Sequence, residues 1–171
     1  MIFISGVHGV GKSYFCDKVK ENIDIDTYSA SSLISERKQA AFSSDKLIPD
    51  IDDNQKYLLE AVTELRQTKD NFILDGHFCL LNANGEVQRI TRDTFTTLMP
   101  EAILLLTEQP EIIVSRRKNR DGRDVSVESI KAFQDEEISY AKEVAVEIGA
   151  KLFISEGADD LMNAIEFIKS C

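Results

Sequence analysis

The stretch GVHGVGKS, residues 6–13, gives the clearest prediction that this sequence offers. It matches the pattern G-x-x-x-x-G-K-[ST], whose backbone N–H groups, here around Gly9, Gly11 and Lys12, converge on phosphate oxygens. The apolar run IFIS (2–5) before it predicts a strand, and a helix is expected from the loop to about residue 22. Because the N-terminus of that helix adds a partial positive charge, the stretch predicts a phosphate-binding loop.

The residues of this loop have separate predicted roles. Lys12 is expected to neutralise the β- and γ-phosphates of a nucleotide, and the hydroxyl of Ser13 is expected to bind Mg²⁺. His8 is better explained as a variable loop position than as a catalytic group. The predicted ATP-binding residues are Gly9, Val10, Gly11, Lys12, Ser13 and Tyr14.

Beyond the loop, short apolar runs alternate with helical patterns, and no repeat or linker interrupts them. Such alternation predicts an α/β fold with a parallel sheet covered by helices on both faces. An Asn-Gly pair at 84–85 predicts a tight turn and hence a small hairpin. Strands are expected at 2–5, 24–29, 71–75, 102–107 and 150–155, a loop at 43–52, and helices after the second strand, at about 53–69, at 91–99, from 110, at 126–148 and at 159–169.

Composition and charge limit the class of protein. With 171 residues, of which 43% are apolar and 29% charged, the chain is expected to form one domain, residues 1–171. No apolar run is long enough to span a membrane and the N-terminus shows no signal pattern, so we expect no membrane partner and a cytoplasmic location. The net charge of −10 disfavours a long nucleic acid but allows a small phosphate ligand at a local basic cluster. Cys16, Cys79 and Cys171, without CxxC spacing, argue against disulfides and zinc.

Polar residues end the predicted strand at 71–75. Asp75 lies at its carboxyl end, where it is suitably placed to hold Mg²⁺ directly or through water. Gly76 and His77 follow at the same rim. The imidazole could orient a water or a substrate phosphate, although a structural histidine is an equally good explanation. Ligands of open α/β sheets bind at this edge, so we predict a metal and acceptor site there.

The segment SRRKNRDGRD (115–124) concentrates basic residues in an otherwise acidic chain and contains a break at Gly122. By itself, such a run is as often a solvated surface as a site. Beside a phosphate loop it predicts a lid over about 115–125, whose arginines would act together with Lys12. These cations would stabilise the charge of a transferring phosphoryl group, and the lid would exclude water.

The segment TYSASSLISERK (27–38) combines small hydroxyl residues with Leu33 and Arg37. It could hold the base and phosphate of an acceptor nucleotide, or it could be an ordinary capped helix. We predict an acceptor-binding segment over about 27–60.

Together, the phosphate loop, FILDGH (72–77) and RRKNRDGRD (116–124) before a long acidic helix resemble the archaeal-type adenylate kinases. These are P-loop nucleoside monophosphate kinases. The resemblance extends in order and spacing through nearly the whole chain. It implies a three-layer P-loop NTPase fold with a five-stranded parallel sheet in the order 2-3-1-4-5, and reversible transfer of the γ-phosphate of Mg·ATP to AMP.

The resemblance also implies site residues. Arg116, Arg120 and Arg123 match the lid arginines that bridge the two nucleotides in the family, which makes them catalytic residues together with Lys12. Ser29, Leu33 and Arg37 fall where the acceptor site begins, and Gln88 falls where a glutamine could read an adenine edge. The family pattern implies ATP and Mg²⁺ as ligands and a homo-oligomer, such as a trimer. Two departures are His8, at a loop position that is often proline in the family, and residues 27–42, which do not match closely and leave the acceptor open.

Three classes of function follow. The favoured one is a kinase acting on AMP or on another small hydroxyl or phosphate acceptor. The second is an ATP-dependent assembly or regulatory factor with slow hydrolysis; a guanine-specific switch would carry an N-K-x-D motif, which this sequence lacks. The third is a nucleic-acid-end kinase, which the net charge disfavours.

Overall fold

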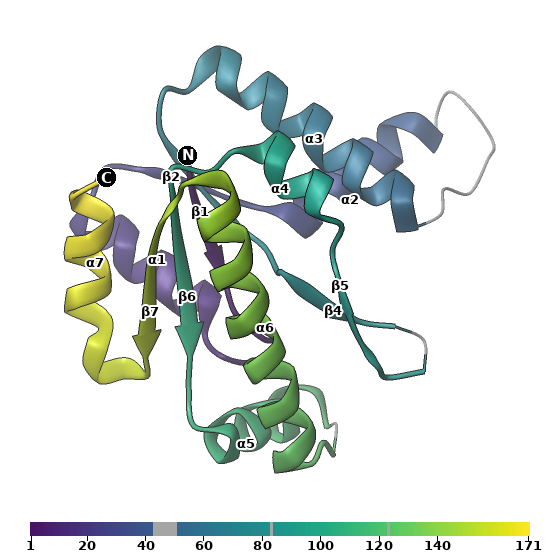
Figure 1. The fold of residues 1–171 in the computed structure, drawn as a ribbon, viewed down its shortest axis with the longest axis vertical. Coiled ribbons are helices and arrows are strands. Elements are labelled where there is room, and N and C mark those ends of the chain that lie inside the picture. Colours follow the sequence, from purple (N-terminus) through teal and green to yellow (C-terminus); the bar gives the residue numbers. More distant parts are fainter. Residues whose placement is uncertain (43–50, 83, 123) are drawn as a thin grey trace.

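The computed structural model describes residues 1–42, 51–82, 84–122 and 124–171. Its centre is a five-stranded parallel sheet in the order β2-β3-β1-β6-β7 (Figure 1). The labels run past five because two hairpin strands, β4 and β5, lie between β3 and β6 in the chain; without them the order is the expected 2-3-1-4-5. The five strands are β1 (Ile2–Ser5), β2 (Asp26–Ser29), β3 (Phe72–Asp75), β6 (Ala102–Thr107) and β7 (Lys151–Glu156).

The central strands are apolar because both of their faces are covered. Every residue of β1 and of β6 is buried, as are the first three residues of β3. Continuous apolar runs are typical of parallel strands with helices on both sides. The register aligns Ile4 of β1 with Asp75 of β3 and with Leu104 of β6. The ends of β1 and β3 therefore bring the phosphate loop and Asp75 to one edge.

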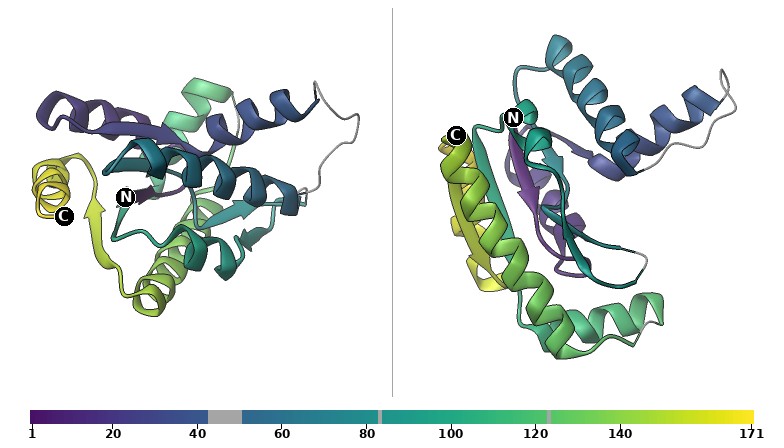
Figure 2. Two further views of the ribbon diagram at one scale, coloured as in Figure 1. Left: turned by 90° about the horizontal axis from the view of Figure 1, so that it is seen from above. Right: turned by 45° about the vertical axis from the view of Figure 1, so that its right-hand side comes forward.

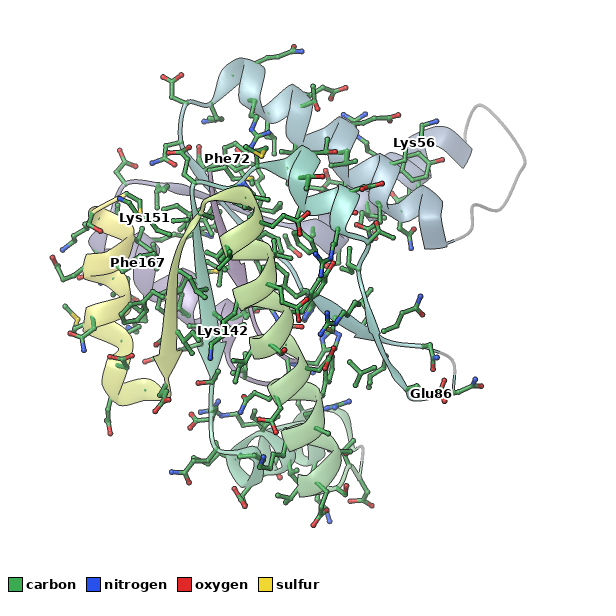
Figure 3. All side chains as sticks on the ribbon, viewed as in Figure 1. Lys56, Phe72, Glu86, Lys142, Lys151 and Phe167 are labelled. Carbon is green, nitrogen blue, oxygen red and sulfur yellow. The ribbon has the colours of Figure 1, made fainter. Side chains whose placement is uncertain are left out.

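Helices cover the two faces of this sheet. α6 (Val127–Ile148) crosses one face against β6 and β7, while α1 (Lys12–Asn22) and α7 (Leu161–Lys169) lie on the other (Figure 1). Phe167 of α7, labelled in Figure 3, stacks on Phe153 of β7 with ring centroids 5.3 Å apart. A short 3-10 turn, η1 (Ala158–Asp160), precedes α7.

A pair of helices extends away from the sheet. α2 (Ala30–Phe42) packs along α3 (Ile51–Thr68) to form an arm beside β2, and α4 (Arg92–Leu98) contacts α3 (Figure 2). α5 (Pro110–Asp121) lies at the carboxyl ends of the strands. Residues 43–50 of the expected loop lie outside the described part of the chain. Within the described part, no helix is long and apolar enough to cross a membrane.

The predicted hairpin is confirmed. β4 (Cys79–Leu81) pairs with β5 (Val87–Arg89) in antiparallel fashion as a separate two-stranded sheet. The Asn82 side chain accepts hydrogen bonds from the backbone N–H groups of Asn84 and Glu86, each 2.9 Å long. Gly85 takes the positive φ of 80° that such a turn requires.

Candidate functional site

A cavity of about 820 Å³ opens at the carboxyl edge of the sheet. One side is the phosphate loop with Gly9, Gly11, Lys12, Ser13 and Tyr14. The other side is formed by the ends of β2 and β3 together with α2, α3, α4 and the hairpin. α5 contributes its arginines at the mouth. Segments from most of the chain thus meet around one space of the size expected for a small-molecule site.

The backbone of the loop explains its glycines. Gly9 and Gly11 adopt φ values of 92° and 113°, a region that favours glycine. Val10 between them is buried, and its carbonyl accepts a hydrogen bond of 2.8 Å from Arg116 Nη1. Arg116 Nη2 also donates to Glu108 Oε2 over 3.1 Å. Arg116 therefore ties α5 to the loop.

Lys12 lies almost buried at the start of α1. Its ammonium donates to the Gly6 carbonyl over 2.8 Å and lies 3.9 Å from Asp75 Oδ1. Burial lowers the pKa of Lys12, and the negative charges of Asp75 and Glu137 partly oppose that effect. The loop thus holds a largely buried cation that lines the cavity, which suits it to a phosphate ligand.

Asp75 and His77 line the cavity beside Lys12, from β3 and the residues after it. Burial raises the pKa of Asp75, and the Lys12 charge counteracts part of this rise. Burial, followed by the charges of Lys12 and His8, lowers the pKa of His77 to about 2. His77 Nε2 lies 3.4 Å from Lys12 Nζ, and its ring centroid lies 4.2 Å from that of His8. His77 is therefore neutral at ordinary pH and can offer hydrogen bonds but no charge.

Ser13 and Asp75 meet the requirements of a magnesium site. Both line the cavity, and Asp75 Oδ1 is buried without a hydrogen-bond partner among the described residues. A hydroxyl and a carboxylate oxygen are ligands that Mg²⁺ prefers, with water and substrate phosphates completing its shell. The described residues contain no cluster of three or more acidic, histidine or cysteine side chains able to hold a metal by themselves. The residues present therefore fit a metal that arrives with a phosphate ligand.

Glu137 was missed by the sequence reasoning. This residue of α6 is only 1% exposed, although it carries a carboxyl group. Its Oε1 accepts from the backbone N–H of Phe78 over 2.9 Å and from the Ser5 hydroxyl, and its Oε2 accepts from the N–H of Cys79 over 2.7 Å. Burial raises the pKa of Glu137, and these hydrogen bonds oppose the rise. One carboxylate thus fixes the end of β1 to the segment that follows His77.

Three of the six predicted acceptor residues line the cavity and three do not. Ser29, Gly76 and His77 line the cavity, and an added Cβ on Gly76 would lie 2.8 Å from the Phe3 ring. Leu33, Arg37 and Gln88 do not line it. Leu33 packs against the core, Arg37 forms ion pairs with Glu60 and Glu64 of α3, and Gln88 is exposed on β5.

The side of the cavity away from the phosphate loop is mostly apolar. Gln55, Ser31 and Thr94 are polar side chains on this side that the sequence reasoning did not single out. They come from α3, α2 and α4. The apolar lining on this side comes from Phe3, Ala30, Ile34, Leu58, Leu80, Ile90, Phe95 and Leu98.

The structure describes two of the three predicted lid arginines. Arg116 and Arg120 line the cavity with Asn119, all from α5. α5 ends at Asp121, and its C-cap residue Gly122 takes a φ of 63°. Arg123 lies outside the described residues. Two cations of α5 therefore line the same cavity as the phosphate loop.

The cysteines form no site among the described residues. All three are free, with Cys16 and Cys79 buried and Cys171 exposed. Burial raises the pKa of Cys16 and that of Cys79 to about 12 each, so both thiols stay protonated.

Comparisons with known proteins agree with this geometry. The family model described as "AAA domain" matches residues 5–134, which include the phosphate loop, the β3 rim and the α5 arginines. An adenylate kinase of Thermoplasma acidophilum is 28% identical over 170 residues, covering 92% of this chain and 91% of the relative.

Solved structures show the same fold at low sequence identity. A gluconokinase from Sinorhizobium meliloti matches with a TM-score of 0.56 and 18% identity, covering 96% of this chain and 86% of its own. A sugar kinase from a Janibacter species matches with a TM-score of 0.59 and 17% identity, covering 99% and 91%. A shikimate kinase from Bacteroides thetaiotaomicron matches with a TM-score of 0.57 and 11% identity, covering 99% and 95%. Identities this low establish the fold and nothing of the substrate.

Proposed function

Because the chain belongs to the AAA domain family, we propose that it is an ATP-dependent phosphotransferase that moves the γ-phosphate of Mg·ATP to a small acceptor, first of all AMP. The observation that carries this proposal is the two-sided cavity. A phosphate loop with Lys12 and the α5 arginines forms one side, and a largely apolar wall forms the other. AMP is the leading acceptor because the Thermoplasma relative is named an adenylate kinase.

Each residue group has a stated role in this proposal. Gly9 to Ser13 bind the donor phosphates, and Lys12 carries the charge nearest to them. Ser13 and Asp75 hold Mg²⁺, which when bound supplies charge neutralisation for the phosphates. The chain's own part is to orient the two substrates and to exclude water, since phosphoryl transfer needs positioning and electrostatics more than covalent chemistry. Ser29, Gly76 and His77 lie where the acceptor would enter.

A second acceptor class has support from the same cavity. The described arginines near the apolar wall do not line the cavity, because each of them binds another group. Arg37 pairs with Glu60 and Glu64, Arg66 donates to the Leu98 carbonyl, and Arg89 and Arg92 pair with carboxylates of α6. A phosphate acceptor would then rely on Lys12, Arg116 and Arg120 alone among described cations in the lining. A neutral hydroxyl acceptor held by Asp75 would need no further cation.

An acceptor panel separates these alternatives. Purified protein with Mg·ATP receives AMP, CMP, UMP, GMP, dTMP, adenosine, gluconate or shikimate one at a time, and chromatography resolves all nucleotides. We expect ADP only when AMP is present, two molecules for each AMP consumed. Phosphorylation of adenosine or another hydroxyl compound would instead support a neutral hydroxyl acceptor. Slow ADP release that ignores every acceptor would contradict the kinase and favour an ATPase acting as an assembly factor.

Arg120→Ala tests the role of the lid. Arg120 lines the cavity from α5, where it faces the phosphate loop. If its charge acts mainly in the transition state, kcat should fall about 100-fold while the Kd for ATP changes less than about threefold. Steady-state kinetics with a separate ATP titration measures both quantities.

Arg116→Ala is the comparison for that test. Arg116 holds the Val10 carbonyl of the loop, so its loss should weaken ATP binding as well as turnover. Equal losses of kcat and ATP affinity in Arg120→Ala would make Arg120 a simple phosphate anchor.

A further inference from the structure

Arg117 differs from the basic residues beside it. It is only 6% exposed, and its Nε is buried without a hydrogen-bond partner. Arg116 is bonded to Val10 and Glu108, and Lys118 Nζ lies 3.3 Å from Asp124. By contrast, the structure gives Arg117 no ion pair or hydrogen bond to any residue that it describes. Arg117 is therefore a nearly buried cation whose Nε lacks a hydrogen-bond partner and which forms no ion pair among the described residues.

The side chain of Arg117 lies against the phosphate loop. A Cβ added to Gly9 would be 2.8 Å from Arg117 Cγ and 3.4 Å from its Cδ, with Ile113 Cγ2 at 3.3 Å. Ile113 and Arg117 are four residues apart on α5 and so share one face of that helix. This face supports the loop at Gly9. The aliphatic part of the arginine packs on the loop, and its charge is kept close by.

An unpaired cation in this place is costly for the free protein. A guanidinium remains charged in proteins, and a buried charge without a partner is strongly unfavourable. The loop does not supply a counter-charge, because its N–H groups and the α1 N-terminus are themselves electropositive. The arrangement becomes favourable when an anion binds at the loop, where the proposed donor places its polyphosphate.

We propose that Arg117 is a further donor-binding residue, whose charge beneath Gly9 is neutralised when the polyphosphate of ATP binds the loop. The inference rests on the proposed ATP binding but not on the identity of the acceptor. Arg117 acts on affinity rather than on the transferring group, because it does not line the cavity. A purely structural role, in which the aliphatic stem only supports Gly9, predicts instead that ATP affinity is unchanged when the charge is removed and the stem is kept.

Arg117→Met tests the charge, because methionine keeps an unbranched stem and removes the guanidinium. Without ATP, we expect its melting temperature to equal or exceed that of the native protein, since an unpaired buried charge is gone. The Kd for ATP and for inorganic tripolyphosphate should rise about tenfold or more. Thermal unfolding and isothermal titration at 50 and 200 mM salt measure these quantities, and the salt dependence of binding should become weaker in the variant.

Lys118→Met is the matched control, because it removes the same charge from the next residue of α5. Lys118 is largely exposed, so its Kd for ATP should stay within about twofold of the native value. Arg117→Lys keeps both stem and charge and should retain most of the affinity.

The outcomes separate the inference from the proposed function. Unchanged affinity in Arg117→Met overturns the inference, whatever its melting temperature. Equal losses in Arg117→Met and Arg117→Lys also overturn it, because shape rather than charge would then matter. If the native protein binds ATP but transfers phosphate to no acceptor, the proposed kinase fails, while the affinity ratios still decide the role of Arg117. A native protein that binds neither ATP nor tripolyphosphate overturns both.

Discussion

Lys12→Ala is expected to reduce phosphate transfer at least about 1000-fold, a loss of roughly 4 kcal/mol of transition-state stabilisation. Lys12 is held by the Gly6 carbonyl and lies 3.9 Å from Asp75 Oδ1. Its removal takes away the charge closest to the donor phosphates. It also takes away the cation whose charge lowers the pKa of the Asp75 carboxyl, so that this pKa should rise further. Both effects act against binding a metal-bound triphosphate.

The measurement is kcat/KM for the acceptor found in the panel, with ATP affinity determined separately. Lys18→Ala is the control: Lys18 belongs to the same helix, but it is paired with Glu21 on the surface. That variant should retain native turnover and a native melting temperature, because an exposed pair contributes about 1 kcal/mol or less. If Lys12→Ala kept more than about one tenth of the native turnover, the assignment of the loop as the donor site would be wrong.

Local patterns explain why most of the fold could be predicted. The glycine loop carries its own geometry, since Gly9 and Gly11 need their backbone conformations wherever the loop occurs. Buried parallel strands show as short apolar runs, and these placed β1, β3 and β6 within a residue or two. The sheet order came from the resemblance rather than from such a pattern.

The acceptor side was harder to predict, because its polar residues carry no fixed spacing. Gln55 lines the cavity and Gln88 does not, although no sequence spacing distinguishes one glutamine from the other. Arg37 was predicted as an acceptor residue from its nearness to the second strand. In the structure it pairs with Glu60 and Glu64, contacts that depend on how α2 packs along α3. Tertiary packing decides such positions, and the sequence alone does not show it.

Two buried charged residues, Arg117 and Glu137, were also not predicted, because their burial depends on tertiary packing. Arg117 is one of five basic residues within positions 116–123, and only its spacing of four from Ile113 distinguishes its face of α5. Glu137 lies in an acidic helix but shares the apolar stripe of Phe133, Tyr140 and Ala141. A charged residue on an apolar stripe indicates a buried interaction, because charged residues are rarely buried unless they are paired. The partners of Glu137 lie 58, 59 and 132 residues away in the chain.

Of the substitutions proposed here, replacement of Glu137 should lower the free energy of unfolding the most. Glu137→Leu keeps the volume of the side chain but leaves the N–H groups of Phe78 and Cys79 and the Ser5 hydroxyl without their acceptor. Buried donors left unpaired cost about 1–3 kcal/mol each, so we expect the free energy of unfolding to fall by about 3 kcal/mol or more. Glu137→Gln should lose less, because one amide oxygen still accepts while its NH₂ group opposes one of the N–H donors.

Chemical denaturation measures these losses, and Glu136→Gln is the matched control. Glu136 is the preceding residue of α6, and its carboxylate pairs with Arg89 at the half-exposed surface, so its replacement should cost about 1 kcal/mol or less. The carboxylate of Glu137 joins the end of β1 to the residues after His77, so kcat should also fall in folded Glu137→Gln while ATP affinity remains near the native value. A variant with native stability would contradict the hydrogen-bonded carboxylate. A variant that loses stability but keeps native kcat would show that the Glu137 carboxylate supports the fold without setting the distance between the donor loop and the acceptor rim.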